Sequence, residues 1–286
     1  VTVENTGNQD TSITVPSDAA NYMDLSSLTT FADSLMKTAD LKQYRITGTI
    51  NANMSIIGIP INANIPMDFR LKLNADNTVQ SAYINLDVPY FIGVLQQDMT
   101  AKVYYEDGVL YFDRNWETST GALWWKEYYD HHEYMKCTID EFMANPMKYV
   151  YFCTNFTSMV ENAINDAIAK SDQKAVRTGN IMFEEALTGF NYNGSNQWNV
   201  NLDAAHLINN SDFSDQMSIT VGRGSNGILN SISLSTRVLD MINLQLNNGQ
   251  LVNADKSNVD MSVVPTGLSS NPNYVFGEVT VVETKK

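Results

Sequence analysis

The chain lacks the apolar run that a membrane-spanning helix requires. Among its 286 residues no segment approaches the roughly eighteen consecutive apolar residues that would span a bilayer. The sequence therefore predicts no transmembrane helix. With 43% hydrophobic and 17% charged residues, the chain is long enough to bury a substantial core.

Basic residues are scarce. The chain has 18 Lys and Arg against 32 Asp and Glu, a formal net charge of −14. Such a surface repels phosphate backbones, so nucleic acid is not expected as a partner. The same charge argues against electrostatic docking on anionic lipid headgroups.

Recognisable catalytic and metal-binding motifs are missing. The chain contains no Gly-X-Ser-X-Gly, P-loop, His-Glu-X-X-His or EF-hand pattern. His131 and His132 are adjacent on a predicted strand and point to opposite faces, which disfavours a shared metal ion. Residues 222–227 match Gly-X-Gly-X-X-Gly, but 228–235 alternate like a strand, which indicates a hairpin turn. We therefore expect no enzyme activity, catalytic residue, metal or cofactor.

Cysteine is nearly absent. Cys137 and Cys153 are the only two, too few for a disulfide framework in a chain of this length. In an exported protein they could pair and staple the region between them. They could equally be two buried thiols, and the sequence leaves both readings open.

The clearest pattern present is an alternation of period two over residues 61–73. A strand places every second side chain on one face, so this run predicts one long strand, about 43 Å in length, with a single apolar face. Its apolar members are Ile61, Ala63, Ile65, Met67, Phe69, Leu71 and Leu73. Residues 46–56 alternate in the same way, and Pro66 predicts an edge position or a bulge.

Further strands are expected before and after a helical region. Glu106-Asp107-Gly108 is typical of a hairpin turn, and so is Asn247-Asn248-Gly249. The remaining predicted strands are 79–87, 99–105, 109–112, 124–129, 197–202, 217–222, 228–238, 242–246, 251–255 and 274–283.

Helical spacing occurs in a few segments. Residues 27–39 carry Leu28, Phe31, Leu35 and Met36 on one face, with Ser26 or Ser27 as the N-cap. Thr138-Ile-Asp-Glu141 is a capping-box pattern that opens a short helix before Pro146. Other predicted helices are 155–170, 180–187 and 203–209.

These elements predict an α+β fold that is mostly antiparallel β: a large curved sheet, or half-barrel, packed on a few helices. We expect residues 1–25 to form a flexible N-terminal tether and 26–286 a single β-rich domain with a helical insert at about 138–190. Because the polar tether starts at Val1 without an initiator Met, we expect a removed signal peptide or lipoprotein signal ahead of it.

The order of segments resembles a known family. Tyr44-Arg-Ile-Thr-Gly-Thr-Ile50 follows an amphipathic helix, and Val103-Tyr-Tyr-Glu-Asp-Gly-Val-Leu-Tyr-Phe112 precedes Trp124-Trp125-Lys126. This layout resembles exported bacterial lipoproteins of the superfamily that includes the lipoprotein carriers and the mycobacterial lipid-binding lipoproteins. The resemblance implies a half-barrel that holds acyl chains against helices. It also implies an extracellular, cell-surface or periplasmic location, with membrane attachment only through a removed N-terminal lipid anchor.

The favoured hypothesis is a monomeric, non-enzymatic binding protein for an apolar ligand such as a lipid or lipid-linked molecule. A sheet with one apolar face that the helices do not fully cover would leave an apolar cavity. The residues expected to line it are Ala63, Ile65, Met67, Phe69, Ala82, Ile84, Val103, Trp124, Met159 and Ile164. The alternative is a cell-surface module that binds glycan or protein through exposed aromatic side chains around Trp124 and Trp125.

Overall fold

A computed structural model describes residues 25–56, 59–92, 95–122, 124–145, 148–149, 152–153, 187–203, 216–238 and 242–286. The helices are α1 (Leu25–Ala39), α2 (Ile139–Ala144) and the 3-10 helix η2 (Leu268–Ser270). The strands are β1 (Gln43–Ile56), β2 (Ile59–Leu73), β3 (Val79–Ile92), β4 (Leu95–Glu106), β5 (Val109–Ala122), β6 (Trp125–Thr138), β7 (Leu187–Tyr192), β8 (Gln197–Asp203), β9 (Gln216–Arg223), β10 (Leu229–Val238), β11 (Ile242–Leu251) and β12 (Thr280–Lys285).

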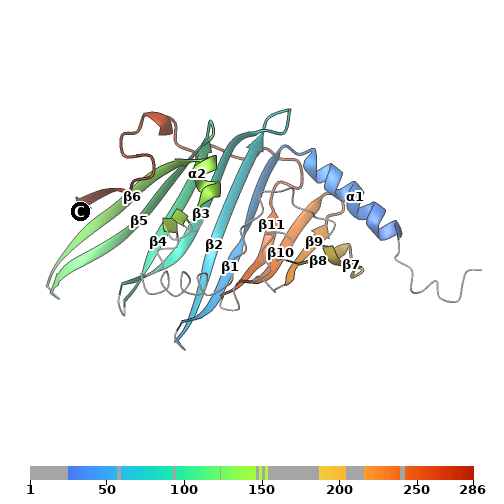
Figure 1. Cartoon of the computed structure of the whole chain (residues 1–286), viewed down its shortest axis with the longest axis horizontal. Coiled ribbons are helices and arrows are strands. Elements are labelled where there is room, and N and C mark those ends of the chain that lie inside the picture. Colours follow the sequence, from blue (N-terminus) through green and yellow to red (C-terminus); the bar gives the residue numbers. More distant parts are fainter. Residues whose placement is uncertain are drawn as a thin grey trace, which may run out of the picture.

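All twelve strands belong to one antiparallel sheet in the order β12-β6-β5-β4-β3-β2-β1-β11-β10-β9-β8-β7. The N-terminal strand β1 pairs with both β2 and β11, so strands from the two ends of the chain meet in the middle of the sheet. The sheet stays open, with α1 beside one end and α2 toward the other (Figure 1). The predicted fold class, a large curved antiparallel sheet packed on a few helices, is confirmed.

The two faces of the sheet differ in character. Cross-strand partners share a face, and the register aligns Phe69 with Ile84 and Val103 with Phe112. We call this side the inner face, since residues of both helices pack on it. The outer face carries a cluster of tyrosines that includes Tyr104 and is covered by the C-terminal segment.

Helix α1 packs over the β7–β10 end of the sheet, and its predicted position is confirmed. Phe31 lies against Phe190 and Trp198, with ring centroids 5.2 and 5.5 Å apart. The predicted N-cap is wrong, because the helix begins at Leu25 and Ser27 is buried within its first turn. Only Phe31 of the predicted apolar face of α1 packs on the sheet in this way. Its other members are exposed: Leu28 38%, Leu35 45% and Met36 63%.

Helix α2 has the predicted capping box. The Glu141 backbone N–H donates to Thr138 Oγ1, and the Thr138 N–H donates to the Glu141 carboxylate. These bonds satisfy orphan donors of the first turn and stop β6 at Thr138. The predicted helices at 155–170 and 203–209 lie outside the described residues apart from Asp203, which ends β8. The one at 180–187 does too, except that Leu187 begins β7.

The long strand at 61–73 is confirmed as part of β2, and the edge position predicted for Pro66 is confirmed locally, on the side of β2 that faces β3. Pro66 lies in a central strand, paired with Thr49 of β1. The β2–β3 ladder ends beside it, at the pair Met67–Leu86. Because proline cannot donate a backbone hydrogen bond, it is tolerated where the ladder toward β3 stops.

The turn predicted at Asn247-Asn248-Gly249 is wrong. Strand β11 runs through it, and Asn248 has a φ of 53° within the strand. The pairing of β11 with β1 and its pairing with β10 both shift register at these residues, so the segment forms a β-bulge. A Cβ on Gly249 would lie 2.4 Å from the Ile232 carbonyl oxygen, which explains why glycine stands there.

The C-terminal segment 252–279 crosses the outer face before β12 joins the edge beside β6. Arg70 is buried beneath it, paired with Asp68 at 2.7 Å and donating to the Asp260 carbonyl at 2.6 Å. Leu268 and Tyr274 pack on the tyrosine cluster. The outer face is therefore covered by the C-terminal segment over these strands.

Asp113 on β5 is a destabilising feature of this covered region. Its Oδ1 is buried without a hydrogen-bond partner among the described residues, 3.9 Å from His132 Nδ1. Burial raises the pKa of the Asp113 carboxyl, partly offset by His132 and Lys102. The ionised form is thus disfavoured in the folded state, so stability falls as the pH rises through the raised pKa.

We expect Asp113→Asn to increase the free energy of unfolding at pH 7 by about 1–3 kcal/mol, because it removes a buried charge. The gain should vanish near pH 3, where the native carboxyl is protonated. Urea titrations at the two pH values measure this difference. The exposed Asp98→Asn is the control and should stay within about 0.5 kcal/mol of wild type. Equal gains at both pH values would contradict the assignment.

Candidate functional site

The candidate site is the inner face of β1 to β4. The register places Ile84 of β3 between Phe69 of β2 and Val103 of β4, and places Ala82 beside Leu71. On β1, Ala52 lies opposite Ala63 and Ile50 opposite Ile65. The result is a sheet surface that is apolar across neighbouring strands, as alternation on each strand requires.

This surface is incompletely buried. Ile65 is buried, with 7% of the residue exposed, and so are Ala52, Val88, Met99 and Ala101 of the same face. The other predicted residues on these strands are half-buried: Ala63, Met67, Phe69, Ala82, Ile84 and Val103. The structure thus brings seven of the predicted residues onto one face, although it buries them less than the alternation predicted.

The inner face is closed more tightly at its two ends. At one end the ring of Phe112 on β5 stacks on Tyr149 at 5.1 Å and meets Phe152 edge-on at 6.3 Å. At the other end α1 packs its Phe31 against Trp198, whose side chain is fully buried. The half-buried residues of β1 to β4 lie between these two packed regions.

Small side chains lie in the middle of this surface. Ala52 and Ala63 face each other across the β1–β2 ladder, where larger residues would otherwise interdigitate. Ala52 and Ile50, like Met99 and Ala101 of β4, belong to the same inner face but were not predicted as site residues. The alternation along 46–56 and 99–105 indicates that each strand has an apolar face. Only the cross-strand register shows that these apolar faces lie on the same side of the sheet as those of β2 and β3.

Other predicted residues do not join the site. Trp124 lies at the β5–β6 turn with 85% of its side chain exposed, and Trp125 is 62% exposed. Trp124, predicted to line the cavity, lies away from β1 to β4, because β6 begins only at Trp125 and both tryptophans lie at the hairpin end. Met159 and Ile164 lie outside the described residues.

Both cysteines are free, buried thiols within the same apolar cluster, so the disulfide reading does not hold in this structure. Burial raises the pKa of Cys153 to about 12 and also raises the pKa of Cys137. A thiol with a raised pKa forms little thiolate at neutral pH and is a poor nucleophile. The geometry therefore gives neither cysteine a catalytic role.

One buried ion pair interrupts the apolar inner face. Arg114 Nε donates to the Glu133 carboxylate at 2.6 Å, and Nη1 donates to the Phe152 carbonyl at 2.8 Å. The guanidinium carbon lies 4.5 Å from the Phe152 ring centroid. The pair fastens the segment around residue 152 to β5 and β6, at the edge of the half-buried surface.

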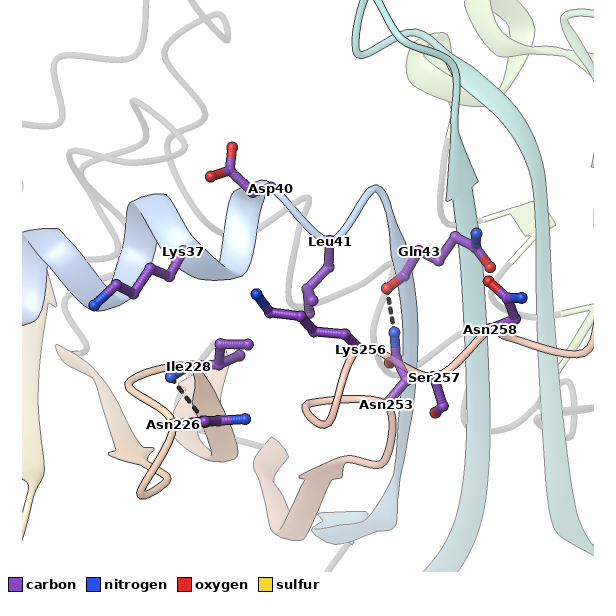
Figure 2. A pocket seen from close by; sticks show the side chains of 10 residues that line it. All are labelled: Lys37, Asp40, Leu41, Gln43, Asn226, Ile228, Asn253, Lys256, Ser257 and Asn258. Atoms are coloured by element: carbon purple, nitrogen blue, oxygen red, sulfur yellow. Dashed lines mark hydrogen bonds between the residues drawn. The ribbon is translucent and has the colours of Figure 1, made fainter.

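A separate small cavity lies where α1, β1 and two turns meet (Figure 2). Its volume is about 240 Å³, and it is lined by Lys37, Asp40, Leu41, Gln43, Asn226, Ile228, Asn253, Lys256, Ser257 and Asn258. Its amides are used structurally: Asn226 donates to the Ala254 carbonyl, and Asn253 accepts from the Arg45 N–H. These contacts indicate a joint between turns, smaller and more polar than a ligand pocket for a lipid.

The histidine pair does not form a metal site. His131 lies beside Trp116 on the inner face, while His132 lies beside Tyr134 on the outer face, as predicted for adjacent residues on a strand. No group of three His, Cys, Asp or Glu side chains within the described ranges is arranged to hold a metal ion. Across the same ranges, the helices are too short or too polar to cross a bilayer.

Comparison with known proteins adds no further assignment. The chain matches no protein-family model, and no curated protein is significantly similar to it. The function is therefore argued from the geometry above.

Proposed function

We propose that this protein binds an apolar ligand, such as a lipid or the acyl chain of a lipid-linked molecule, on the inner face of β1 to β4, and that it catalyses no reaction. The observation that carries the proposal is a central sheet surface, apolar in register over neighbouring strands, on which six predicted side chains remain half-buried beside fully buried ones. Exposed apolar area of this kind favours association with an apolar partner.

Two further features support a flexible ligand. Unbranched Met67 and the small pair Ala52 and Ala63 lie on this surface, and such side chains accommodate chains of variable shape. The resemblance to exported lipid-binding lipoproteins agrees with this ligand class. It is also the basis for placing the protein outside the cytoplasm, which is part of the same proposal.

Substitution of Ala63 tests the site. A fluorescent fatty acid should bind the wild-type protein with a Kd in the micromolar range, about −8 kcal/mol. Ala63→Trp should weaken this binding at least about tenfold with little change in melting temperature, because the indole would occupy space that the ligand uses. If the surface is instead filled by protein, the same change should overpack it and cost about 1–3 kcal/mol of stability.

The same strand supplies a matched control. Asn64 is exposed and lies on the opposite face of β2, so Asn64→Trp adds the same side chain one position away and should leave fatty-acid binding unchanged. Native mass spectrometry of the purified protein gives an independent measurement of bound lipid. Absence of fatty-acid binding by the wild-type protein, or equal weakening by both variants, argues against the proposed site.

A further inference from the structure

The outer face of the sheet changes character away from the tyrosine cluster. In the middle of the sheet, where β2, β1 and β11 are neighbours (Figure 1), six amide side chains lie on this face in two cross-strand rows. They are Asn64, Asn51 and Gln245 in the first row and Asn62, Asn53 and Asn243 in the second. We call these six side chains the amide face. Cross-strand partners are close neighbours, so the amides form one continuous polar surface.

The first row continues across three more strands. Gln245 aligns with Ser235 of β10, Ser235 with Ser218 of β9, and Ser218 with Asn201 of β8. Neighbouring strands lie about 4.8 Å apart, so the row from β2 to β8 is about 24 Å long. Every residue in it carries an amide or a hydroxyl group. The row is therefore long enough to contact several units of an extended polymer.

These strands carry almost no charge. The chain holds no Asp, Glu, Lys or Arg in residues 46–67, 187–202, 216–222, 228–236 and 241–254. Charged residues border the rows at strand ends, with Arg237 opposite Asn243 and Asp203 opposite Gln216. In a protein with a net charge of −14, this surface offers a charged ligand few opposite charges and is complementary to an uncharged one.

The amide face retains its hydrogen-bonding capacity for a ligand. Asn53, Asn62 and Asn64 are exposed, and the other three amides are half-buried. Within the part of the chain that the structure describes, none of the six side chains hydrogen-bonds to another residue. Each amide offers two N–H donors and a carbonyl acceptor. Because β1, β2 and β11 are each paired on both sides, these groups are held in place before a ligand arrives, which lowers the entropic cost of binding.

We propose that the amide face binds a neutral glycan in an extended conformation. Sugar hydroxyls both donate and accept hydrogen bonds, as the amides do, and an extended chain can contact successive strands of one row. A folded protein fits less well, because the cores of protein interfaces are enriched in aromatic residues, Met and Arg, which the two rows lack. Acidic polymers would need basic side chains. The amide face lies on the opposite side of the sheet from the proposed lipid site and does not depend on it.

Calorimetric titration with two neutral hexasaccharides, cellohexaose and N-acetylchitohexaose, tests the amide face. The wild-type protein should bind at least one of them with a Kd below about 1 mM, and the corresponding disaccharide at least about tenfold more weakly, because it contacts fewer strands. Asn62→Ala/Asn64→Ala should weaken hexasaccharide binding at least about tenfold, since each substitution removes hydrogen bonds to the ligand. The melting temperature should not change, because both side chains are exposed. Asn193→Ala/Asn258→Ala removes two exposed amides elsewhere and is the matched control, expected to bind as wild type does.

Several results would overturn the proposal. These are no binding of either hexasaccharide by the wild-type protein, equal weakening by the two double variants, and tighter binding of heparin than of the neutral sugars. A wild-type dimer in sedimentation experiments that Asn62→Ala/Asn64→Ala dissociates would also overturn it, because the face would then be an interface between two copies. Ala63→Trp should retain glycan binding, and Asn62→Ala/Asn64→Ala should retain fatty-acid binding, so the two sites are tested separately.

Discussion

Trp198→Ala should lower the free energy of unfolding by about 3–5 kcal/mol, the usual cost of truncating a buried Trp. The side chain of Trp198 on β8 is fully buried. Its ring lies 5.5 Å from both Phe31 and Tyr192, and its Nε1 donates to the Ser27 carbonyl at 3.2 Å. It is thus a main contact between α1 and the sheet, together with the Phe31–Phe190 pair, because the other predicted apolar residues of α1 are exposed.

Urea unfolding and hydrogen exchange measure the two parts of this effect. A lower urea midpoint reports a loss of overall stability. Faster hydrogen exchange of the α1 amides reports detachment of the helix from the sheet. Trp198→Phe keeps a ring but loses the hydrogen bond, and should cost less than half as much. Trp125→Ala at the exposed β5–β6 turn is the matched control and should stay within about 0.5 kcal/mol of wild type. A Trp198→Ala protein as stable as that control would show that α1 does not depend on this side chain.

The second large effect is expected from Glu133→Ala, which leaves the Arg114 guanidinium without its carboxylate partner. The side chains of both residues are only 14% exposed. Removing one member of a buried pair typically costs about 3–5 kcal/mol, because the remaining charge is desolvated and has lost the opposite charge of its partner. We expect thermal or urea unfolding to show a loss of this size.

The double variant Arg114→Met/Glu133→Leu separates the charge effect from packing. It removes both charges and retains apolar volume, so it should recover most of the stability that Glu133→Ala loses. Some loss should remain, because the bond from Arg114 to the Phe152 carbonyl is also gone. A double variant less stable than Glu133→Ala would mean that this contact, rather than the balance of charge, dominates.

The local elements were predictable because their causes are local. Alternation over 61–73 follows from the two-residue period of a strand, and it correctly predicted the strand and its apolar face. Thr138 and Glu141 correctly predicted the start of α2, since a capping box involves only four consecutive residues. Glycine and asparagine positions were less decisive, as the bulge at Asn247–Gly249 demonstrates.

The candidate site was predictable only in part. The residues of β2, β3 and β4 were identified from their alternation, but their common surface depends on hairpin register, which a single strand does not specify. The pairing of β1 with β11 joins residues about two hundred positions apart, such as Ile46 and Leu251. No local sequence pattern predicts this pairing. Trp124 was misplaced because the position of a turn, off by one residue, decides whether a side chain joins the strand.

The sequence alone determined the antiparallel β class, the strong alternation that makes one face apolar, and the net negative charge. Net charge is a sum over residues, and strand alternation is a two-residue period along neighbouring residues, so both can be read without knowing the contacts. Only the tertiary structure decided that part of the inner face stays half-buried between two packed ends, and that the C-terminal segment covers the opposite face. Burial and edge position depend on which strands lie side by side, and that is set by contacts between distant parts of the chain.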